Sequence, residues 1–267
     1  VKFQRVRQIL DDHPQIRADL PKRYIRTLHY IINAQIELGE LKGARATIKY
    51  MRELPALPGF GGQNIETLVF VASSLGELNL LDRSGEHAKA IELTPGVIAG
   101  MEALGDRLHK EQELMLYFTL ACVHFGGGEM NKALFWLNKV LNDNEPTLRQ
   151  DIFTYARLFN LVIHYELGNF DLLEYIVRST QRFMSKRHRA EGMETVLMDH
   201  IRKLARATET TAKRELYKSM LARFNEVLVD PNESLVLKYF DVVSWAKAHV
   251  EDVTFSEVVR RRANTTA

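Results

Sequence analysis

Apolar residues recur at helical spacing on both sides of the triple glycine Gly126–Gly128. Spacings of three, four and seven residues place side chains on one face of a helix. Glycine between two such runs ends the first helix, because it is the poorest helix former after proline and readily adopts the left-handed conformation. The pattern predicts two amphipathic helices joined by a tight turn. Their apolar stripes are Leu114, Tyr117, Phe118, Ala121 and Phe125 before the turn, and Ala133, Trp136, Leu137, Val140 and Leu141 after it.

The same pair of helices is predicted around two further glycines, Gly39 and Gly168. Around Gly39 the stripes are Tyr24, Leu28, Ile31 and Leu38, then Leu41, Ala44, Ile48 and Met51. Around Gly168 they are Ile152, Tyr155, Ala156, Phe159 and Ile163, then Phe170, Leu173, Val177, Thr180 and Met184. Neither helix of a pair can bury its stripe alone, so repetition at this scale predicts an array in which the pairs stack.

Residues at matching positions of these pairs resemble the tetratricopeptide repeat. A small residue follows the turn glycine by five positions in Gly39–Ala44 and in Gly128–Ala133. Two departures stand out: the 40 residues from Gly128 to Gly168 exceed the family's roughly 34, and Leu173 occupies the position of the small residue. The other residues that carry the resemblance are the bulky Trp136 and Leu137 and the prolines Pro55 and Pro146 after the second helices.

This resemblance implies an all-α fold, a right-handed α-solenoid of antiparallel helix pairs with degenerate repeats. Such stacks curve and expose a concave face that binds peptides or partner proteins. Residues 158–176 and 239–259 also resemble a group of uncharacterised bacterial tetratricopeptide-like proteins, a resemblance that implies no known activity. We expect a single helical-repeat domain over residues 1–267. Because the chain opens on Val1 in helix-like sequence, we also expect it to be the C-terminal part of a longer protein.

The remaining segments are also predicted to be helical, apart from one clear loop. The proline- and glycine-rich stretch Pro55–Gln63 predicts that loop. Thr94–Pro95 has the form of an N-cap followed by a first-turn proline, which predicts a helix start. Thr254 and Glu257 form a capping box ahead of the closing helix. The helices expected outside the three pairs cover residues 3–12, 14–20, 65–81, 94–108, 190–206, 211–229 and 233–249, and no segment alternates as a strand would.

The composition is that of an ordinary globular chain, with 46% hydrophobic and 26% charged residues among 267. No apolar run reaches the roughly 18 residues of a membrane span. The single cysteine, Cys122, leaves no intramolecular disulfide and suits a reducing compartment, so we expect a cytoplasmic protein.

Three features suggest chemistry, but each has a structural interpretation that we favour. Gly126–Gly128 precedes a helix, as a phosphate-binding loop would, yet it lacks the preceding strand and the Gly-Lys-Ser/Thr sequence. His124 and His164 occupy equivalent positions four residues before their turn glycines and could meet to bind a metal ion; without ligands beside them, we expect packing residues. Cys122 has no base nearby in sequence and is expected to fill space. We therefore expect no enzyme, metal site or cofactor.

The leading function is a non-catalytic scaffold that binds a protein or peptide on the concave face. In tetratricopeptide-like units, first-helix residues face that side. Arg26, His29 and Asn33 share spacings of three and four residues, and Asn160 occupies a similar place in a later pair. We name these as candidate contacts, although solvation of an exposed helix explains them equally well.

A second hypothesis rests on charge. Residues 178–223 hold 12 Lys/Arg and 5 Asp/Glu, a net charge of +7, in a chain whose total is +2. Arg178, Arg182 and Lys186 recur every four residues and so share one helix face. This basic surface could bind an acidic peptide, a nucleic acid or an anionic lipid, or it could be a solvated face that the acidic remainder of the chain balances. Because few aromatic residues lie nearby for base stacking, we rank nucleic acid below protein as a partner. The alternative function is thus a regulatory or nucleic-acid-associated protein.

Overall fold

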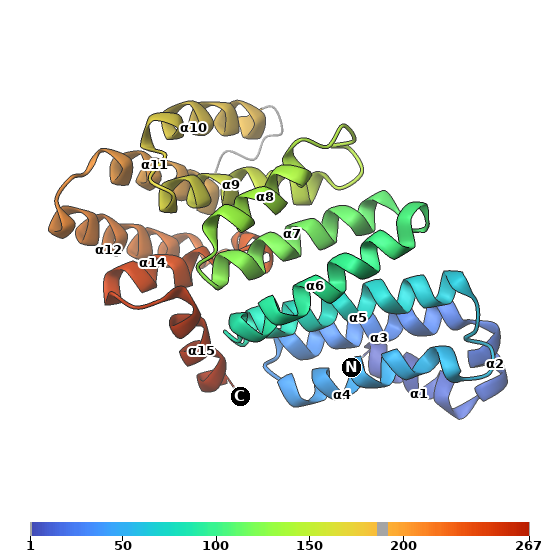
Figure 1. Ribbon diagram of the computed structural model, residues 1–267. Coiled ribbons are helices and arrows are strands. Elements are labelled where there is room, and N and C mark those ends of the chain that lie inside the picture. The colour runs from blue at the N-terminus through green and yellow to red at the C-terminus, as the bar shows by residue number, and fades with distance from the viewer. Residues whose placement is uncertain (1, 186–191, 267) are drawn as a thin grey trace. The chain divides into compact units, whose positions relative to one another are not determined.

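The computed structural model describes residues 2–185 and 192–266, and within them every regular element is a helix (Figure 1). The prediction of an all-α protein is therefore confirmed for the described part of the chain, which contains no strand. The chain divides into two compact units, Val1–Thr119 with Arg260–Ala267, and Leu120–Val259. We describe each unit by itself.

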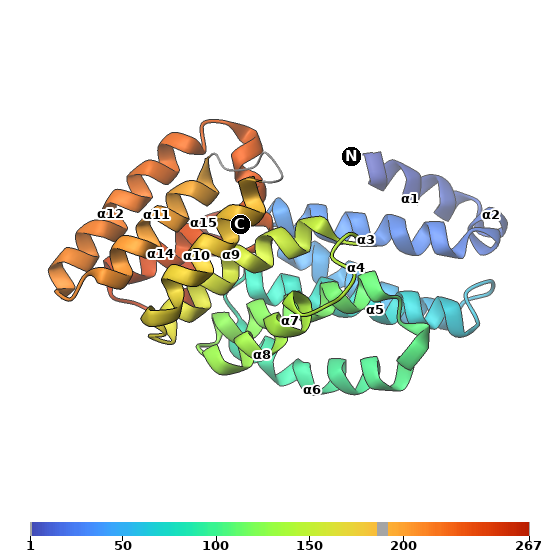
Figure 2. The ribbon, with the colours of Figure 1, turned by 90° about the horizontal axis from the view of Figure 1, so that it is seen from above.

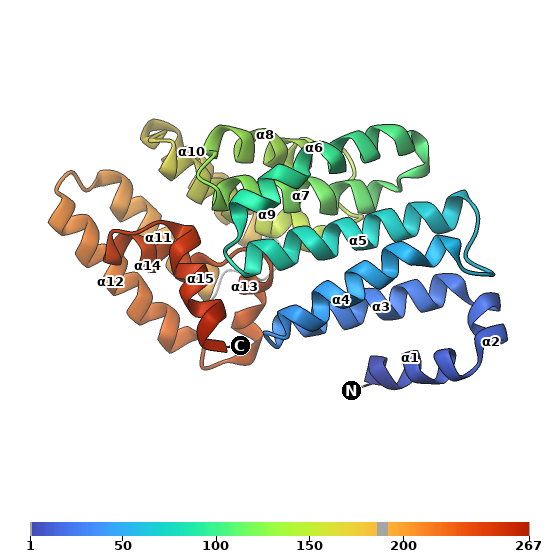
Figure 3. The same cartoon turned by 60° about the horizontal axis from the view of Figure 1, so that its bottom comes forward.

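The first unit begins with two short helices and continues with two long helix hairpins. Helices α3, α4 and α5 pack against one another, α6 packs on α5, and α1 lies against α3 (Figure 3). The elements are α1 (Lys2–Asp12), α2 (Pro14–Asp19), α3 (Pro21–Glu37), α4 (Leu41–Glu53), a 3-10 turn (Leu54–Ala56), α5 (Gln63–Arg83), α6 (His87–Leu104), a second 3-10 turn (Gly105–Arg107) and the first part of α7 (Lys110–Gly126).

The second unit is built around α9, which is buried on most of its surface. Helices α8, α10 and α11 all pack on α9, α12 packs on α11, and α14 packs on α12 (Figure 2). The elements after α7 are α8 (Met130–Leu141), α9 (Gln150–Glu166), α10 (Phe170–Ser185), α11 (Met193–Arg206), α12 (Thr210–Val227), a 3-10 turn (Pro231–Leu235), α13 (Val236–Tyr239), α14 (Val242–Glu251) and α15 (Phe255–Thr266), whose residues from Arg260 onward belong to the first unit.

One turn geometry joins the two helices in each of four hairpins. The turn glycines have φ between 70° and 80°, the left-handed region that costs glycine nothing. The residue after each glycine donates its backbone N–H to the carbonyl five residues earlier, at 2.8–3.0 Å. This is the Schellman arrangement, which satisfies carbonyls left unpaired at a helix end. The glycines are Gly39, Gly85, Gly128 and Gly168.

The α5–α6 hairpin around Gly85 is a repeat that the sequence analysis missed. Its turn, Gly85–Glu86, matches Gly39–Glu40, and Ala90 lies five residues after the glycine, as Ala44 does after Gly39. Ala90 is fully buried. The apolar pattern of α5 hid the match, because this helix is buried on several sides and its hydrophobic residues do not form a single stripe.

Most residues of the predicted stripes are buried, and two are exposed. Leu38 is 66% exposed and Phe170 is 40% exposed. Leu38 is the C-cap of α3, where the backbone leaves the helix, so its side chain departs from the stripe. Phe170 is the first residue of α10 and lies against Tyr165 and the Lys213 ammonium at the edge of the core. Position at a helix end therefore overrides the spacing rule in both.

The predicted helix start at Thr94–Pro95 is wrong, because α6 runs through both residues from His87 to Leu104. A proline inside a helix has no N–H for the carbonyl four residues earlier. That carbonyl belongs to Ile91, and the Thr94 hydroxyl donates to it at 2.9 Å. The threonine thus supplies the hydrogen bond that the proline cannot make, and the helix continues.

The single helix predicted over 233–249 is also wrong. The chain instead forms a 3-10 turn, the short helix α13 and then α14. Phe240 has extended backbone angles between α13 and α14, and the Asp241 carboxylate accepts a hydrogen bond from the Ser244 N–H at the start of α14. An Asp whose carboxylate accepts a hydrogen bond from the backbone N–H three residues later is an N-cap. Asp241 ahead of this helix was therefore a start signal already present in the sequence. The loop at 55–63 and the Thr254 cap are confirmed; Thr254 Oγ1 accepts from the Glu257 N–H at 3.2 Å.

Candidate partner-binding surfaces

The first-helix residues Arg26, His29 and Asn33 lie together on α3, as their spacing predicts. Arg26 is exposed, whereas His29 and Asn33 are half-buried. His29 Nε2 lies 3.1 Å from Asn33 Nδ2, so the two side chains interact with each other. Burial lowers the pKa of His29, and the nearby backbone of Ala72 on α5 opposes that shift only in part. His29 is therefore largely a packing residue, and Arg26 is the most exposed of the three.

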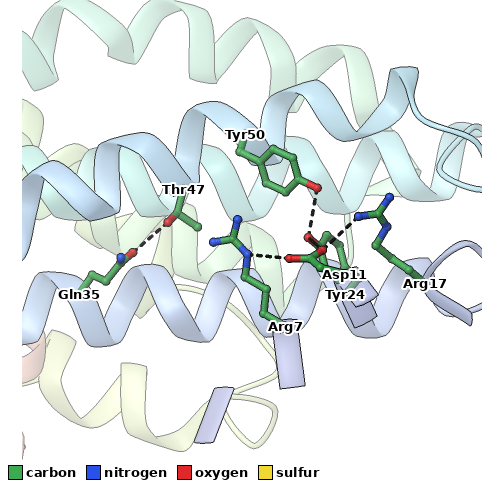
Figure 4. Close-up of polar contacts among 7 residues, drawn as sticks. All are labelled: Arg7, Asp11, Arg17, Tyr24, Gln35, Thr47 and Tyr50. Atoms are coloured by element: carbon green, nitrogen blue, oxygen red, sulfur yellow. Dashed lines mark hydrogen bonds and ion pairs between the residues drawn. The ribbon is translucent and has the colours of Figure 1, made fainter. Parts of the chain in front are cut away.

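A network around the Asp11 carboxylate fixes α1 beside α3 (Figure 4). Tyr24 donates its hydroxyl to Asp11 Oδ1 at 2.6 Å and lies 3.1 Å from the hydroxyl of Tyr50 on α4. Arg17 on α2 donates to Asp11 Oδ1 at 3.0 Å, and Arg7 donates to Asp11 Oδ2 at 3.3 Å. Burial, followed by the hydrogen bond to Asp11, raises the pKa of Tyr24. Four helices are thus tied to one carboxylate, which sets the rotation of α1.

The network leaves an apolar flank of α1 uncovered, a feature that sequence analysis did not single out. Phe3 stacks on Tyr30 of α3 with ring centroids 4.6 Å apart. Phe3 is 42%, Val6 37%, Ile9 49% and Tyr30 44% exposed. Single exposed apolar residues are common on the surfaces of monomeric proteins, but a contiguous group of them points to an interaction site.

Asn160 lies on α9 in the second unit and is half-buried. Its Oδ1 atom is buried and has no hydrogen-bond partner among the described residues. One helical turn earlier, the Arg157 guanidinium lies 4.4 Å from the centroid of the Phe183 ring of α10. Asn160 is therefore partly covered and does not lie on an open surface.

The basic surface of α10 and α11 is less charged than its sequence suggests. Arg178 of α10 and Arg206 of α11 each lie 3.2 Å from a different oxygen of Glu174. Arg202 donates to the Gln181 side chain at 2.6 Å. Arg182 is exposed, and Lys186 falls outside the described residues. The structure thus brings Arg178 close to Arg206 through a shared carboxylate, an acid that lies before residue 178 and was left out of the charge count.

The two equivalent histidines serve their own hairpin turns. His124 Nδ1 lies 2.6 Å from Glu129 Oε2, and His164 Nδ1 lies 3.0 Å from Asn169 Nδ2. Each side chain therefore links the last turn of a first helix to the residue that follows the turn glycine. The packing interpretation of these histidines is supported by their local partners.

Another titratable group joins α9 to α14. The Trp245 indole N–H donates to Glu166 Oε1 at 2.6 Å, and His249 Nε2 lies 2.7 Å from the same oxygen. The His249 ring stacks on Tyr217 of α12 with centroids 4.4 Å apart. The rings of Tyr217, Trp245 and His249 pack directly on one another, so we interpret this cluster as a structural contact that holds the helices together. Sequence spacing gives no hint of it, because Glu166 and His249 are 83 residues apart.

A shallow groove of about 300 Å³ lies on the first unit between α4 and α5. Ile48 and Leu80 contribute its apolar part. Its arginines are already paired: Arg52 with Glu77 in the groove, and Arg45 with Glu86 at the start of α6. Both arginines are thus engaged by carboxylates, and Lys49 is a further cation that lines the groove.

Comparison with known proteins found no matching family model, no matching curated protein and no matching solved structure. Within the described residues, no group of three or more His, Cys, Asp and Glu side chains is arranged to hold a metal ion. In the same part of the chain, no helix is both long and apolar enough to cross a membrane.

Proposed function

We propose that this protein is a non-catalytic interaction module, a tetratricopeptide-like stack of helix hairpins that binds a segment of a partner protein on its first-helix faces. The observation that carries the proposal is the recurrence of one hairpin turn at Gly39, Gly85, Gly128 and Gly168. Recurrent hairpins are the unit of helical-repeat arrays, which expose an extended face for binding.

The pattern of helix contacts supports the same proposal. Within the first unit, α3 packs on α4 and α5, and α5 packs on α6. Within the second, α9 packs on α8, α10 and α11, and α11 packs on α12. These pairs join helices that are near neighbours in sequence, as in repeat arrays. A cytoplasmic location belongs to this proposal and is supported by cysteine usage, because the single cysteine, Cys122, is buried and forms no disulfide.

Selection of peptides on the immobilised protein tests the proposal. A displayed random-peptide library should yield a shared motif that binds with a Kd of roughly 1 μM, about −8 kcal/mol. Binding should weaken in the double variant Arg26→Ala, Asn33→Ala on α3. It should be unchanged in the control Lys42→Ala, an exposed position on the second helix α4. Failure to enrich any motif would contradict the interaction module, and equal binding to both variants would remove the α3 face.

A second candidate function, binding of an anionic partner through residues 178–223, is favoured by one observation. Two guanidinium groups, Arg178 and Arg206, share the single carboxylate of Glu174, which leaves a net positive charge beside the exposed Arg182. Binding of RNA that falls steeply with salt would support this function. Reversal of Arg182 to Glu should then weaken RNA binding, whereas binding that survives the reversal would exclude this surface.

A further inference from the structure

The surface formed by α1 and α3 combines exposed apolar side chains with cations that lack partners. Six of the large apolar residues exposed in the described chain fall within residues 3–30. The same segment, residues 2–26, holds 7 Lys/Arg and 3 Asp, a net charge of +4. The combination of apolar and basic residues sets the segment apart from the rest of the chain, whose net charge is −2.

The two helices run antiparallel, with the start of α1 beside the second half of α3. Phe3 at the start of α1 stacks on Tyr30 in the second half of α3, and Asp11 at the end of α1 bonds to Tyr24 in the first half. On α1, residues 2, 5 and 9 share one face; on α3, residues 23, 26 and 30 do so. Each row thus contains two cations followed by one large apolar residue: Lys2, Arg5 and Ile9 on α1, and Arg23, Arg26 and Tyr30 on α3.

The cations in these rows are available to a ligand. The only described carboxylate that pairs with an arginine of α1 or α2 is that of Asp11, and it is occupied by Arg7 and Arg17. Lys2, Arg5, Arg23 and Arg26 are exposed and make no ion pair with any residue that the structure describes. Four unpaired cations beside half-exposed apolar side chains are complementary to a ligand that is both acidic and apolar.

We propose that the α1–α3 surface, defined by Phe3, Val6, Ile9 and Tyr30 with Lys2, Arg5, Arg23 and Arg26, binds an acidic amphipathic helix of a partner protein. Apolar side chains at helical spacing on that helix would cover Val6, Ile9 and Tyr30. Its flanking Asp and Glu side chains would pair with the cations on either side. The inference rests on the proposed interaction function and gives it a surface and a class of partner.

An anionic membrane fits this surface less well than a helix does. Peripheral membrane helices bury an apolar face about 5–10 Å into the headgroup region. Here the exposed side chains are already half covered, at 37–49% exposure, and the Asp11 network holds α1 against α3. They form a shallow, fixed surface that an incoming helix can cover without displacing α1.

Binding of synthetic peptides to the full chain tests the inference. The probe is a labelled amphipathic peptide of about 18 residues with leucines at i, i+3 and i+7 spacing and glutamates on the flanks. We expect saturable binding, measured by fluorescence anisotropy, that weakens as salt is raised. A peptide of identical composition in scrambled order should bind at least roughly tenfold more weakly. Equal binding of the two peptides would overturn the helix proposal.

Two double variants locate the binding site. Arg5→Glu with Ile9→Ser alters the α1 row and should weaken probe binding at least roughly tenfold. The matched control, Lys49→Glu with Leu38→Ser, makes the same kinds of change at exposed positions in and beside α4 and should leave the affinity within about twofold. Circular dichroism melting verifies that each variant folds. Equal loss in both variants, or loss in neither, would overturn the assignment to α1 and α3.

Vesicles of phosphatidylcholine and phosphatidylserine test the alternative that the surface binds an anionic membrane. Sedimentation of the protein with these vesicles, lost in the α1 variant, together with no binding of the amphipathic peptide, would overturn the proposal in favour of a membrane.

The experiments distinguish failure of the α1–α3 surface from failure of the proposed interaction function. If display selection yields a motif whose binding is unaffected by the α1 variant, the interaction function survives and the α1–α3 surface does not.

Discussion

Glycine has two separate purposes in this chain. Gly39, Gly85, Gly128 and Gly168 occupy left-handed turns, where any Cβ strains the backbone. At Gly128 and Gly168 an added Cβ would meet no atom within 4 Å, so only the backbone conformation demands glycine there. At Gly100 the reason is space, because a Cβ would lie 2.3 Å from the Phe70 ring.

The turn at Gly168 gives a prediction at the residue scale. Gly168→Val should destabilise the protein by about 1–2 kcal/mol, because a β-branched residue is strained at its φ of 71°. Gly168→Asn should cost less, since asparagine tolerates the left-handed region. Urea unfolding measures both differences. Equal losses would contradict a purely conformational role, as the site has room for either side chain.

At the scale of the element, α6 shows how a helix passes through a proline. Thr94 is buried and its hydroxyl holds the Ile91 carbonyl that Pro95 leaves unpaired. We expect Thr94→Val to destabilise by about 1 kcal/mol, because the Ile91 carbonyl loses its donor. In a Pro95→Ala background, the alanine N–H can donate to Ile91, so the same substitution should cost much less. Additive effects in this double-mutant cycle, measured by thermal unfolding, would contradict the compensation.

The start of α9 gives an element-scale prediction about pH. Burial alone would raise the pKa of Asp151, but hydrogen bonds from Arg149 and from the Tyr239 hydroxyl outweigh it and hold the pKa at about 2. An unfolded aspartate has a pKa of about 3.9. Since the folded pKa is depressed, the stabilisation is fully present above about pH 4 and is lost as the pH falls toward about 2.

Replacement of the carboxylate isolates this effect. Asp151→Asn should destabilise the protein at neutral pH, and the difference from the unmodified protein should shrink as the solution is acidified below about pH 4. Chemical denaturation at a series of pH values measures the difference. A gap that stays constant with pH would show that the stabilisation does not depend on the Asp151 charge.

At the scale of the whole molecule, contacts between near neighbours in sequence predict local rather than global loosening. In repeat arrays a defect weakens its own hairpin and the adjoining helices first. Gly39→Val should therefore speed amide hydrogen exchange in α3, α4 and α5 while exchange in α9–α12 stays unchanged. Hydrogen exchange with mass spectrometry resolves these segments. Simultaneous loss of protection in all helices would indicate one cooperative fold instead of an array.

The helical class, three of the four hairpins and their turns could be predicted from local sequence patterns. These features are local: an apolar stripe has the helical period, and a left-handed turn selects glycine within a few residues. The grouping of Arg26, His29 and Asn33 on one face follows from the same period. The missed hairpin at Gly85 was detectable in the same way, from Gly85–Glu86 and Ala90.

Which of those helix faces remain exposed depends on contacts between residues far apart in the sequence. His29 is half-buried because α5 packs beside α3, and Arg178 and Arg206 share one carboxylate because Glu174 of α10 reaches Arg206 on α11. The exposed flank of α1 depends on the Asp11 carboxylate, which reaches Tyr24 thirteen residues away. Burial and ion pairing join residues distant in sequence, so the periodicity that predicts a helix cannot predict what covers it.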